Sequence, residues 1–298
     1  CVGVSARAID PRTMRPGARV HIVAQHTIIA AGAVQTPVLL ARHRVGRPSR
    51  QLGRNFVTHP NAKMLAVYPQ GISAWKGVAQ WGQVREFHDD GIIFAENMGP
   101  PGVLAAAVGA HGDAAFEAMA GYDKMMLTGV LVEDSASGRV MRGPFGMAVP
   151  MYSLQQIDFV RFMRGLRALA TLHFEMGADH IYLPLAGLHR IDTIDDVARI
   201  DEKRFKIPDI ELFTPHLMGT ARMGAEKQRS VVDLNGEIWD LPGCSVADAS
   251  LFPGPIGVNP QITIIALALR IGERLAERIV AARSNAGHVA TAIGLGGA

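Results

Sequence analysis

The chain has 298 residues, 48% hydrophobic and 19% charged, with a formal net charge of +3. This length is enough for one large globular domain or two. The arginines are spread along the chain, which argues against a nucleic-acid-binding surface. No apolar run reaches the roughly 18–20 residues that span a bilayer, so no transmembrane segment is predicted. Cys1 and Cys244 form neither a disulfide framework nor a zinc pattern, and no metal site is predicted. A soluble protein is expected, cytoplasmic rather than secreted, with the compartment itself left open.

Residues 1–60 are expected to form part of a nucleotide-binding domain. Residues 19–31 are β-branched and apolar and predict one or two strands, which lead into a glycine turn and a short helix. A buried strand that runs into a glycine turn and a helix is typical of α/β nucleotide-binding domains. The stretch "LGRNFVTHP" (52–60) is a polar crossing segment.

Residues 61–215 predict an inserted domain with an antiparallel sheet. Strands are expected in "AKMLAVYP" and "MMLTGVLVED", and "EDSASGRV" predicts a hairpin loop. Ser153 is the expected N-cap of a long helix that Gly177 ends. Its expected core stripe is Leu154, Ile157, Val160, Met163, Leu166 and Leu169.

Residues 216–283 are expected to return to the first domain. A hairpin is predicted with Asn235 and Gly236 at its turn. Asn259 as N-cap and Pro260 as first helical residue would start the last helix, followed by a flexible tail over 284–298. One interpretation of this junction is a well-built helix start, and the other is a helix N-terminus directed at an electron-rich group.

Four stretches together carry a family resemblance: "HTIIAAGAVQTPVLL", "LGRNFVTHP", "PHLMGTARMG" and "VADASLFPGPIGVNPQITIIALALR". In this order they resemble the glucose–methanol–choline (GMC) flavoprotein oxidoreductases, especially the cholesterol-oxidase and long-chain-alcohol-oxidase branch. The resemblance implies an α/β (α+β) fold, in which part of an FAD-binding Rossmann-like domain carries an inserted antiparallel-sheet substrate domain. It also implies FAD as cofactor and oxidation of an alcohol to a carbonyl.

The resemblance assigns the catalytic roles to His216 and Asn259. His216 matches the family's catalytic histidine and would take the hydroxyl proton while the hydride passes to flavin N5; histidine has a suitable unperturbed pKa. Asn259 would donate a hydrogen bond to the substrate oxygen as negative charge develops. Asn259 as an ordinary N-cap remains the alternative.

The resemblance also implies a set of FAD contacts. Asp248 would meet the ribityl–pyrophosphate part, with a turn-forming aspartate as the alternative, and His59 is interpreted as structural. The expected FAD-binding residues are Ala31, Gly32, Gly53, Asn55, Asp248, Ala249, Pro260, Gln261 and Ile262.

No G-x-G-x-x-G segment opens this sequence, although the family uses one to seat the FAD pyrophosphate. We therefore expect a missing segment or a second polypeptide to supply that half. The alternative is a non-catalytic subunit or fragment that needs another chain to bind FAD. The expected substrate is a small-molecule alcohol, lipophilic or sterol-like, met by large apolar residues of the insertion: Trp75, Trp81, Phe87, Phe94, Met98, Phe116 and Met119.

Overall fold

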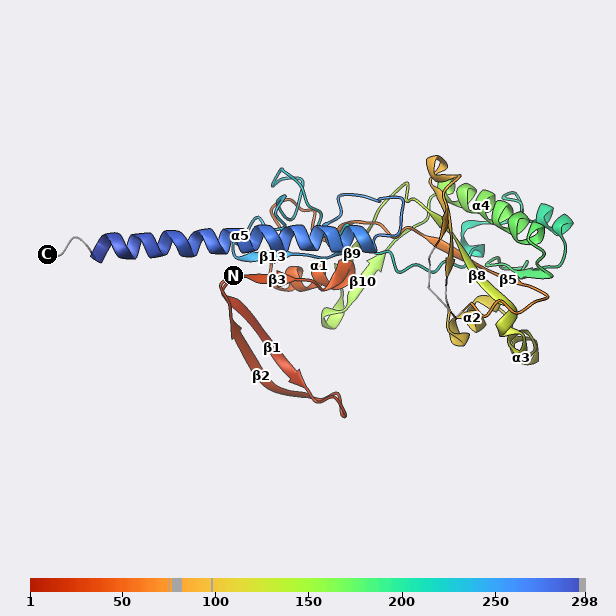
Figure 1. The fold of residues 1–298 in the computed structure, drawn as a ribbon, viewed down its shortest axis with the longest axis horizontal. Helices are drawn as coiled ribbons and strands as arrows, with labels where there is room; N and C mark the ends of the chain where they lie inside the picture. Colours follow the sequence, from red (N-terminus) through yellow and green to blue (C-terminus); the bar gives the residue numbers. More distant parts are fainter. Residues whose placement is uncertain (75, 77–81, 98, 295–298) are drawn as a thin grey trace.

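The computed structural model describes residues 1–74, 76, 82–97 and 99–294 (Figure 1). It is a mixed α/β structure, as expected. The helices are α1 (Gly32–Arg42), α2 (Pro101–Val108), α3 (Asp113–Ala120), α4 (Gln156–Glu175) and α5 (Gln261–Gly294). The strands are β1 (Gly3–Ile9), β2 (Pro16–Val23), β3 (Thr27–Ile29), β4 (Arg54–Phe56), β5 (Asn61–Val67), β6 (Gln83–Val84), β7 (Ile92–Asn97), β8 (Met125–Val132), β9 (Gly138–Arg142), β10 (Ala148–Met151), β11 (His180–Tyr182), β12 (Arg190–Ile191) and β13 (Cys244–Val246).

A short parallel sheet joins distant parts of the chain. Strand β3 pairs with β13, so that Ile29 lies opposite Val246, and α1 begins directly after β3. The predicted strand, glycine turn and helix are therefore present. Their core is closed from one side by Ile271 of α5, which is 2% exposed. This part of the molecule brings the ends of two parallel strands to one edge.

A larger antiparallel sheet has the strand order β12-β11-β5-β8-β7-β6. Successive side chains of a strand point to opposite faces. On β5, Ala62 and Met64 therefore alternate with Leu65: the first two pack beneath α4, and Leu65 packs with α2 on the other face. Figure 1 shows α4 on one side of this sheet and α2 and α3 on the other.

Two smaller sheets complete the fold. Strands β10, β9 and β4 form one, and it lies beside α1. Strands β1 and β2 form a hairpin that projects from the body of the molecule (Figure 1), and most of its side chains are exposed. Exposed apolar residues on this hairpin include Val4, Val20 and Ile22.

The hairpin predicted at "EDSASGRV" is wrong. Strands β8 and β9 lie in different sheets, and β9 pairs with β10 and β4. The physical reason is that this loop is held to backbone distant in sequence: the side chain of its own Asp134 accepts hydrogen bonds from the N–H groups of Thr58 and His59. A crossing between sheets and a hairpin loop share the same polar composition.

The predicted details of the helices also need correction. Helix α4 begins after Gln155, not at a Ser153 cap. Within its predicted stripe, Ile157 and Val160 are 54% and 44% exposed, because the buried face passes through Phe159 and Phe162 instead. Helix α5 continues through Gly294, so the end predicted near Arg283 is wrong. Residues 295–298 lie outside the described chain, and the flexible tail over 284–298 stays a prediction.

No helix among the described residues has the length and apolar character needed to cross a membrane.

Candidate active site

His216 lies on a segment that is bound to the start of β5. The Phe213 N–H donates to the Asn61 carbonyl at 2.8 Å. Thr214 Oγ1 donates to the carbonyls of Thr58 and His59 and accepts from the His216 N–H at 3.1 Å. The backbone that leads into His216 is therefore fixed by the end of the polar crossing segment (52–60) and the start of β5.

Asn259 faces His216 across a short gap. Its Nδ2 lies 3.5 Å from His216 Nε2, and its Oδ1 accepts a 2.7 Å hydrogen bond from Gln83 Nε2 on β6. The predicted N-cap role is wrong: α5 begins at Gln261, and the Pro260 carbonyl accepts the first helical bond, from Ile264 N at 2.8 Å. The Asn259 amide is therefore available to the site rather than used in the cap.

His59 holds the loop that carries Asn259. Its side chain is fully buried, and Nε2 accepts hydrogen bonds from the N–H groups of Ile256 at 3.1 Å and Gly257 at 3.2 Å. A nitrogen that accepts from N–H must keep its lone pair, so the proton of the neutral ring is on Nδ1. Burial lowers the pKa of His59 to about 4, which favours this neutral form. The structural interpretation of His59 agrees with these contacts.

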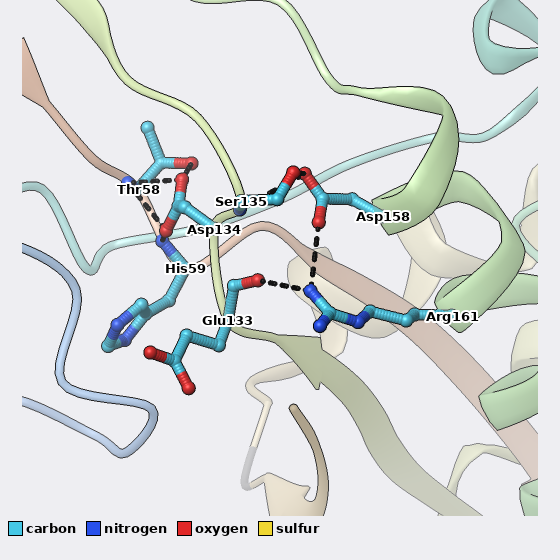
Figure 2. Close-up of polar contacts among 7 residues, drawn as sticks. All are labelled: Thr58, His59, Glu133, Asp134, Ser135, Asp158 and Arg161. Carbon is cyan, nitrogen blue, oxygen red and sulfur yellow. Dashed lines mark hydrogen bonds and ion pairs between the residues drawn. The ribbon is translucent and has the colours of Figure 1, made fainter. Parts of the chain in front are cut away.

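A polar network in turn fixes the backbone of His59 (Figure 2). Asp134 accepts from Thr58 N at 3.0 Å and from His59 N at 2.7 Å, and burial raises its pKa. The next residue, Ser135, donates to Asp158 of α4 at 2.8 Å. Arg161 bridges Asp158 Oδ1 and the Glu133 carbonyl at 3.2 and 3.3 Å. The loop after β8 therefore links α4 to His59, the residue that holds the loop leading into Asn259.

The surroundings keep the His216 imidazole neutral. Burial, together with the nearby His59 and Lys63, lowers its pKa to about 4. The rings of His59 and His216 meet edge to face, with centroids 6.1 Å apart. A neutral imidazole at pH 7 is able to accept a proton from a hydroxyl group.

The buried histidines predict a loss of stability in acid. His59 and His173 have folded pKa values of about 4, below the usual 6.5, and His173 is held between Tyr68 and Thr128. Below pH 6.5 the unfolded chain binds protons that the folded chain does not, so stability falls toward pH 4. The expected slope is about 1.4 kcal/mol per pH unit for each histidine. Urea unfolding at several pH values measures it, and His173→Gln should reduce the slope by one histidine's share; an unchanged slope would contradict this.

Four predicted FAD-binding residues gather at the carboxyl ends of β3 and β13, where ligands bind in α/β sheets. Ala31 is exposed at the start of α1, and a Cβ added to Gly32 would meet no atom within 4 Å. Asp248 instead turns inward: it accepts from Gly32 N at 2.9 Å, Thr36 Oγ1 at 2.6 Å and Ser250 N at 2.8 Å. These contacts are those of the alternative interpretation, a turn-forming aspartate. The backbone carbonyl of Ala249 accepts a hydrogen bond from the Gly219 N–H.

Gly53 and Asn55 differ in their surroundings. A Cβ on Gly53 would lie 2.3 Å from the Val140 carbonyl, so this glycine is required by packing against β9. Asn55 borders two adjoining cavities of about 650 and 220 Å³, which also share Ser137.

The three expected FAD contacts at the N-terminus of α5 differ in exposure: Pro260 is buried, whereas Gln261 and Ile262 are exposed. The open backbone at Gly32 and the polar cavities beside Asn55 fit an extended, polar cofactor such as FAD.

The residues of the expected apolar lining lie in different surroundings. Phe87 and Phe94 pack on the α4 face of the large sheet, and Phe116 is 79% exposed. Gln83 pairs with Ala95, the residue after Phe94, and so lies on the opposite face from Phe94. Trp75, Trp81 and Met98 lie outside the described residues. Among the residues that are described, no group of three or more potential ligands could hold a metal ion.

Sequence reasoning missed Gln83 and the acceptor role of His59. A two-residue strand gives too short a pattern to detect, and a histidine tautomer depends on which donors the fold brings to it. The His-Pro dipeptide at 59–60 marked the position without indicating its partner.

Two family models described as GMC oxidoreductase match the chain, one at residues 1–61 and one at 138–268. An uncharacterized GMC-type oxidoreductase of Mycobacterium tuberculosis is 30% identical over 94% of this chain and 44% of its own length. A long-chain-alcohol oxidase of Arabidopsis thaliana is 25% identical over 96% of this chain and 40% of its own length. The chain thus spans less than half the length of these curated relatives.

Solved structures share the fold. A pyridoxine 4-oxidase from Mesorbium loti has a TM-score of 0.63 at 18% identity, covering 92% of this chain and 54% of that protein. A formate oxidase has a TM-score of 0.57 at 16% identity, covering 92% and 57%. This similarity supports the expected Rossmann-like architecture with an inserted sheet.

Proposed function

Because this chain belongs to the GMC oxidoreductase family, we propose that it carries the catalytic half of an FAD-dependent alcohol oxidoreductase. The observation that carries the proposal is the pair formed by His216 and Asn259, whose Nε2 and Nδ2 atoms lie 3.5 Å apart beside the N-terminus of α5. Family membership supplies the reaction class. The pair supplies the two functions that alcohol oxidation requires of the protein.

His216 acts as the base in this proposal. Its neutral Nε2 accepts the proton of the substrate hydroxyl group. The Asn259 amide donates a hydrogen bond to the same oxygen, where negative charge develops, and Gln83 orients that amide. FAD, if held by this chain, would supply the acceptor for the hydride of the carbinol carbon.

Several residues of the chain would hold the cofactor. Gly32 offers open backbone at the ends of two parallel strands, and Asn55 borders the polar cavities. The first N–H groups of α5, at Gln261 and Ile262, would stabilise negative charge on the reduced ring. Asp248 and Gly53 act indirectly, by fixing the backbone on which these contacts depend.

The pyrophosphate end of FAD needs residues that this sequence does not contain. No G-x-G-x-x-G segment is present, and the chain matches 44% of the length of a curated relative. This favours keeping the second candidate: a chain that binds no flavin without a further segment or polypeptide. An absorbance spectrum of the isolated protein separates the two. Flavin bands that bleach on anaerobic addition of an alcohol support the enzyme, and colourless protein that stays colourless with added FAD supports the second candidate.

The relatives include long-chain-alcohol oxidases, which supports a lipophilic alcohol as substrate.

Asn259→Ala is expected to slow flavin reduction by about 100-fold, because one donor to the developing oxyanion is lost. The free energy of unfolding should change little, since the Pro260 carbonyl and not Asn259 begins the helical bonding. Stopped-flow absorbance and urea unfolding measure the two quantities. Gln83→Ala, which removes only the orienting side chain, should give a smaller loss. A large loss of stability with unchanged chemistry would return Asn259 to a structural role.

A further inference from the structure

One row of residues crosses the large sheet on the face that meets Asn259. Gln83 of β6, which donates to Asn259, is paired with Ala95 of β7. Ala95 is paired with Gly129 of β8, and Gly129 with Lys63 of β5. Directly paired residues of antiparallel strands share a face. Lys63 therefore lies on the same face of the sheet as the residue that holds the catalytic amide.

Three polar side chains converge over Gly129. Lys63 Nζ donates to Asn97 Oδ1 at 2.9 Å. A Cβ on Gly129 would lie 3.1 Å from Lys63 Nζ and 2.5 Å from Asn61 Oδ1, so the missing side chain of glycine makes room for both groups. Asn61 is 4% exposed, and its Oδ1 has no hydrogen-bond partner among the described residues.

Lys63 is only partly buried. In the described part of the chain no carboxylate lies within ion-pair distance of Nζ, although Glu211 borders the same cavity. Burial lowers the pKa of Lys63 to about 8. A cavity of about 170 Å³ is lined by Lys63 together with residues of α2 and Phe213. A buried charge without a partner costs free energy, which an anionic ligand would offset.

The strand order sets the separation between the Lys63 ammonium and the strand that carries Gln83. Lys63 Nζ lies over β8, two strands away from β6, which corresponds to roughly 10 Å at the usual strand spacing. Lys63 is close enough to His216 to lower the pKa of that imidazole.

We propose that Lys63 and Asn97, which meet over Gly129, form a subsite for a carboxylate of the substrate; this inference rests on the proposed function. The substrate is then a hydroxy acid, with its hydroxyl group at His216 and Asn259 and its carboxylate at Lys63. The Lys63 ammonium donates to the carboxylate, Asn97 orients the ammonium, and the apolar wall of the cavity contacts the connecting alkyl chain.

The test compares ω-hydroxy acids of about six to ten carbons with their methyl esters, a range that covers the roughly 10 Å separation. In the flavin-loaded protein, Lys63→Met should lower kcat/KM for the acid by about 10- to 100-fold, the usual worth of a charge-assisted hydrogen bond. The ester should change by less than about 3-fold. Lys63→Arg should retain most of the preference for the acid. Lys124→Met, which removes an exposed charge at the start of β8, should leave both substrates unaffected.

The outcomes are distinguishable. Equal losses for acid and ester would mean that Lys63 acts on His216 or on folding, and this would overturn the carboxylate subsite. If the wild-type protein oxidises neither substrate, the proposed function fails. The subsite is then decided by binding alone: the NMR signal of reductively ¹³C-methylated Lys63 should shift with octanoate and not with methyl octanoate. No shift would overturn it.

Discussion

Replacing His216 with alanine is expected to lower the rate of flavin reduction by an alcohol by about 10²- to 10⁴-fold, the usual worth of a general base. The imidazole is neutral because burial lowers its pKa to about 4, and its Nε2 faces Asn259. Without it, the hydroxyl proton has no acceptor within the pair, while the Asn259 amide is still held by Gln83.

Anaerobic stopped-flow absorbance of the flavin bands measures this rate directly. His111→Ala removes a surface histidine and serves as the matched control, for which an unchanged rate is expected. If His216→Ala reduced its flavin as fast as the wild type, another group would have to be the base. Partial recovery by added imidazole would further support proton transfer at this position.

Replacing His59 with leucine is expected to destabilise the fold by about 2–5 kcal/mol and to slow catalysis as well. Leucine has a similar size but no acceptor, so the N–H groups of Ile256 and Gly257 lose their partner inside the protein. The loop they belong to leads directly into Asn259. If the proposed function holds, its movement should raise the barrier to flavin reduction without removing either His216 or Asn259.

Urea unfolding and flavin reduction should be measured on the same preparation of His59→Leu. His43→Leu, an exposed histidine at the end of α1, is the control and should change stability by no more than about 0.5 kcal/mol. Wild-type stability in His59→Leu would show that water satisfies the two N–H groups. Lost stability with an unchanged rate would show that the loop does not position Asn259.

The sequence predicted well wherever a local pattern decides the structure. The apolar run 19–31 contains β3 and most of β2, and "MMLTGVLVED" contains β8, because β-branched residues favour the extended, pleated backbone of a strand. The glycine turn before α1 was also expected. The mixed α/β class and the antiparallel inserted sheet follow from the same signals.

The errors share one cause, which is tertiary contact. The 3.6-residue period located α4 but did not select its buried face, because Phe159 and Phe162 outweigh Ile157 and Val160 in packing against the sheet. Asn259 has the sequence of an N-cap but bonds to Gln83, 176 positions away. A preference measured in short segments does not include such a partner.

The candidate site was predicted in part for the same reason. Motif resemblance named His216 and Asn259, and the fold brings them together. The supporting residues depend on groups that are distant in sequence: His59 on the backbone at 256–257, and Lys63 on the absence of a side chain at Gly129. No local pattern predicts those neighbours.

The pairing of β3 with β13 bears on how the protein is made. Ile29 of β3 can pair with Val246 of β13 only after the intervening chain has been synthesised. At ~5–20 residues per second, translation of that segment takes roughly 10–40 s. During that interval the edge of β3, including the half-exposed Ile28, is open to pairing with other chains. The antiparallel sheet and α4 lie entirely between the two strands in sequence and are complete earlier. Lower growth temperature and a larger supply of chaperones during synthesis should therefore raise the yield of native protein. These conditions should affect that yield more than the free energy of unfolding of the finished protein does.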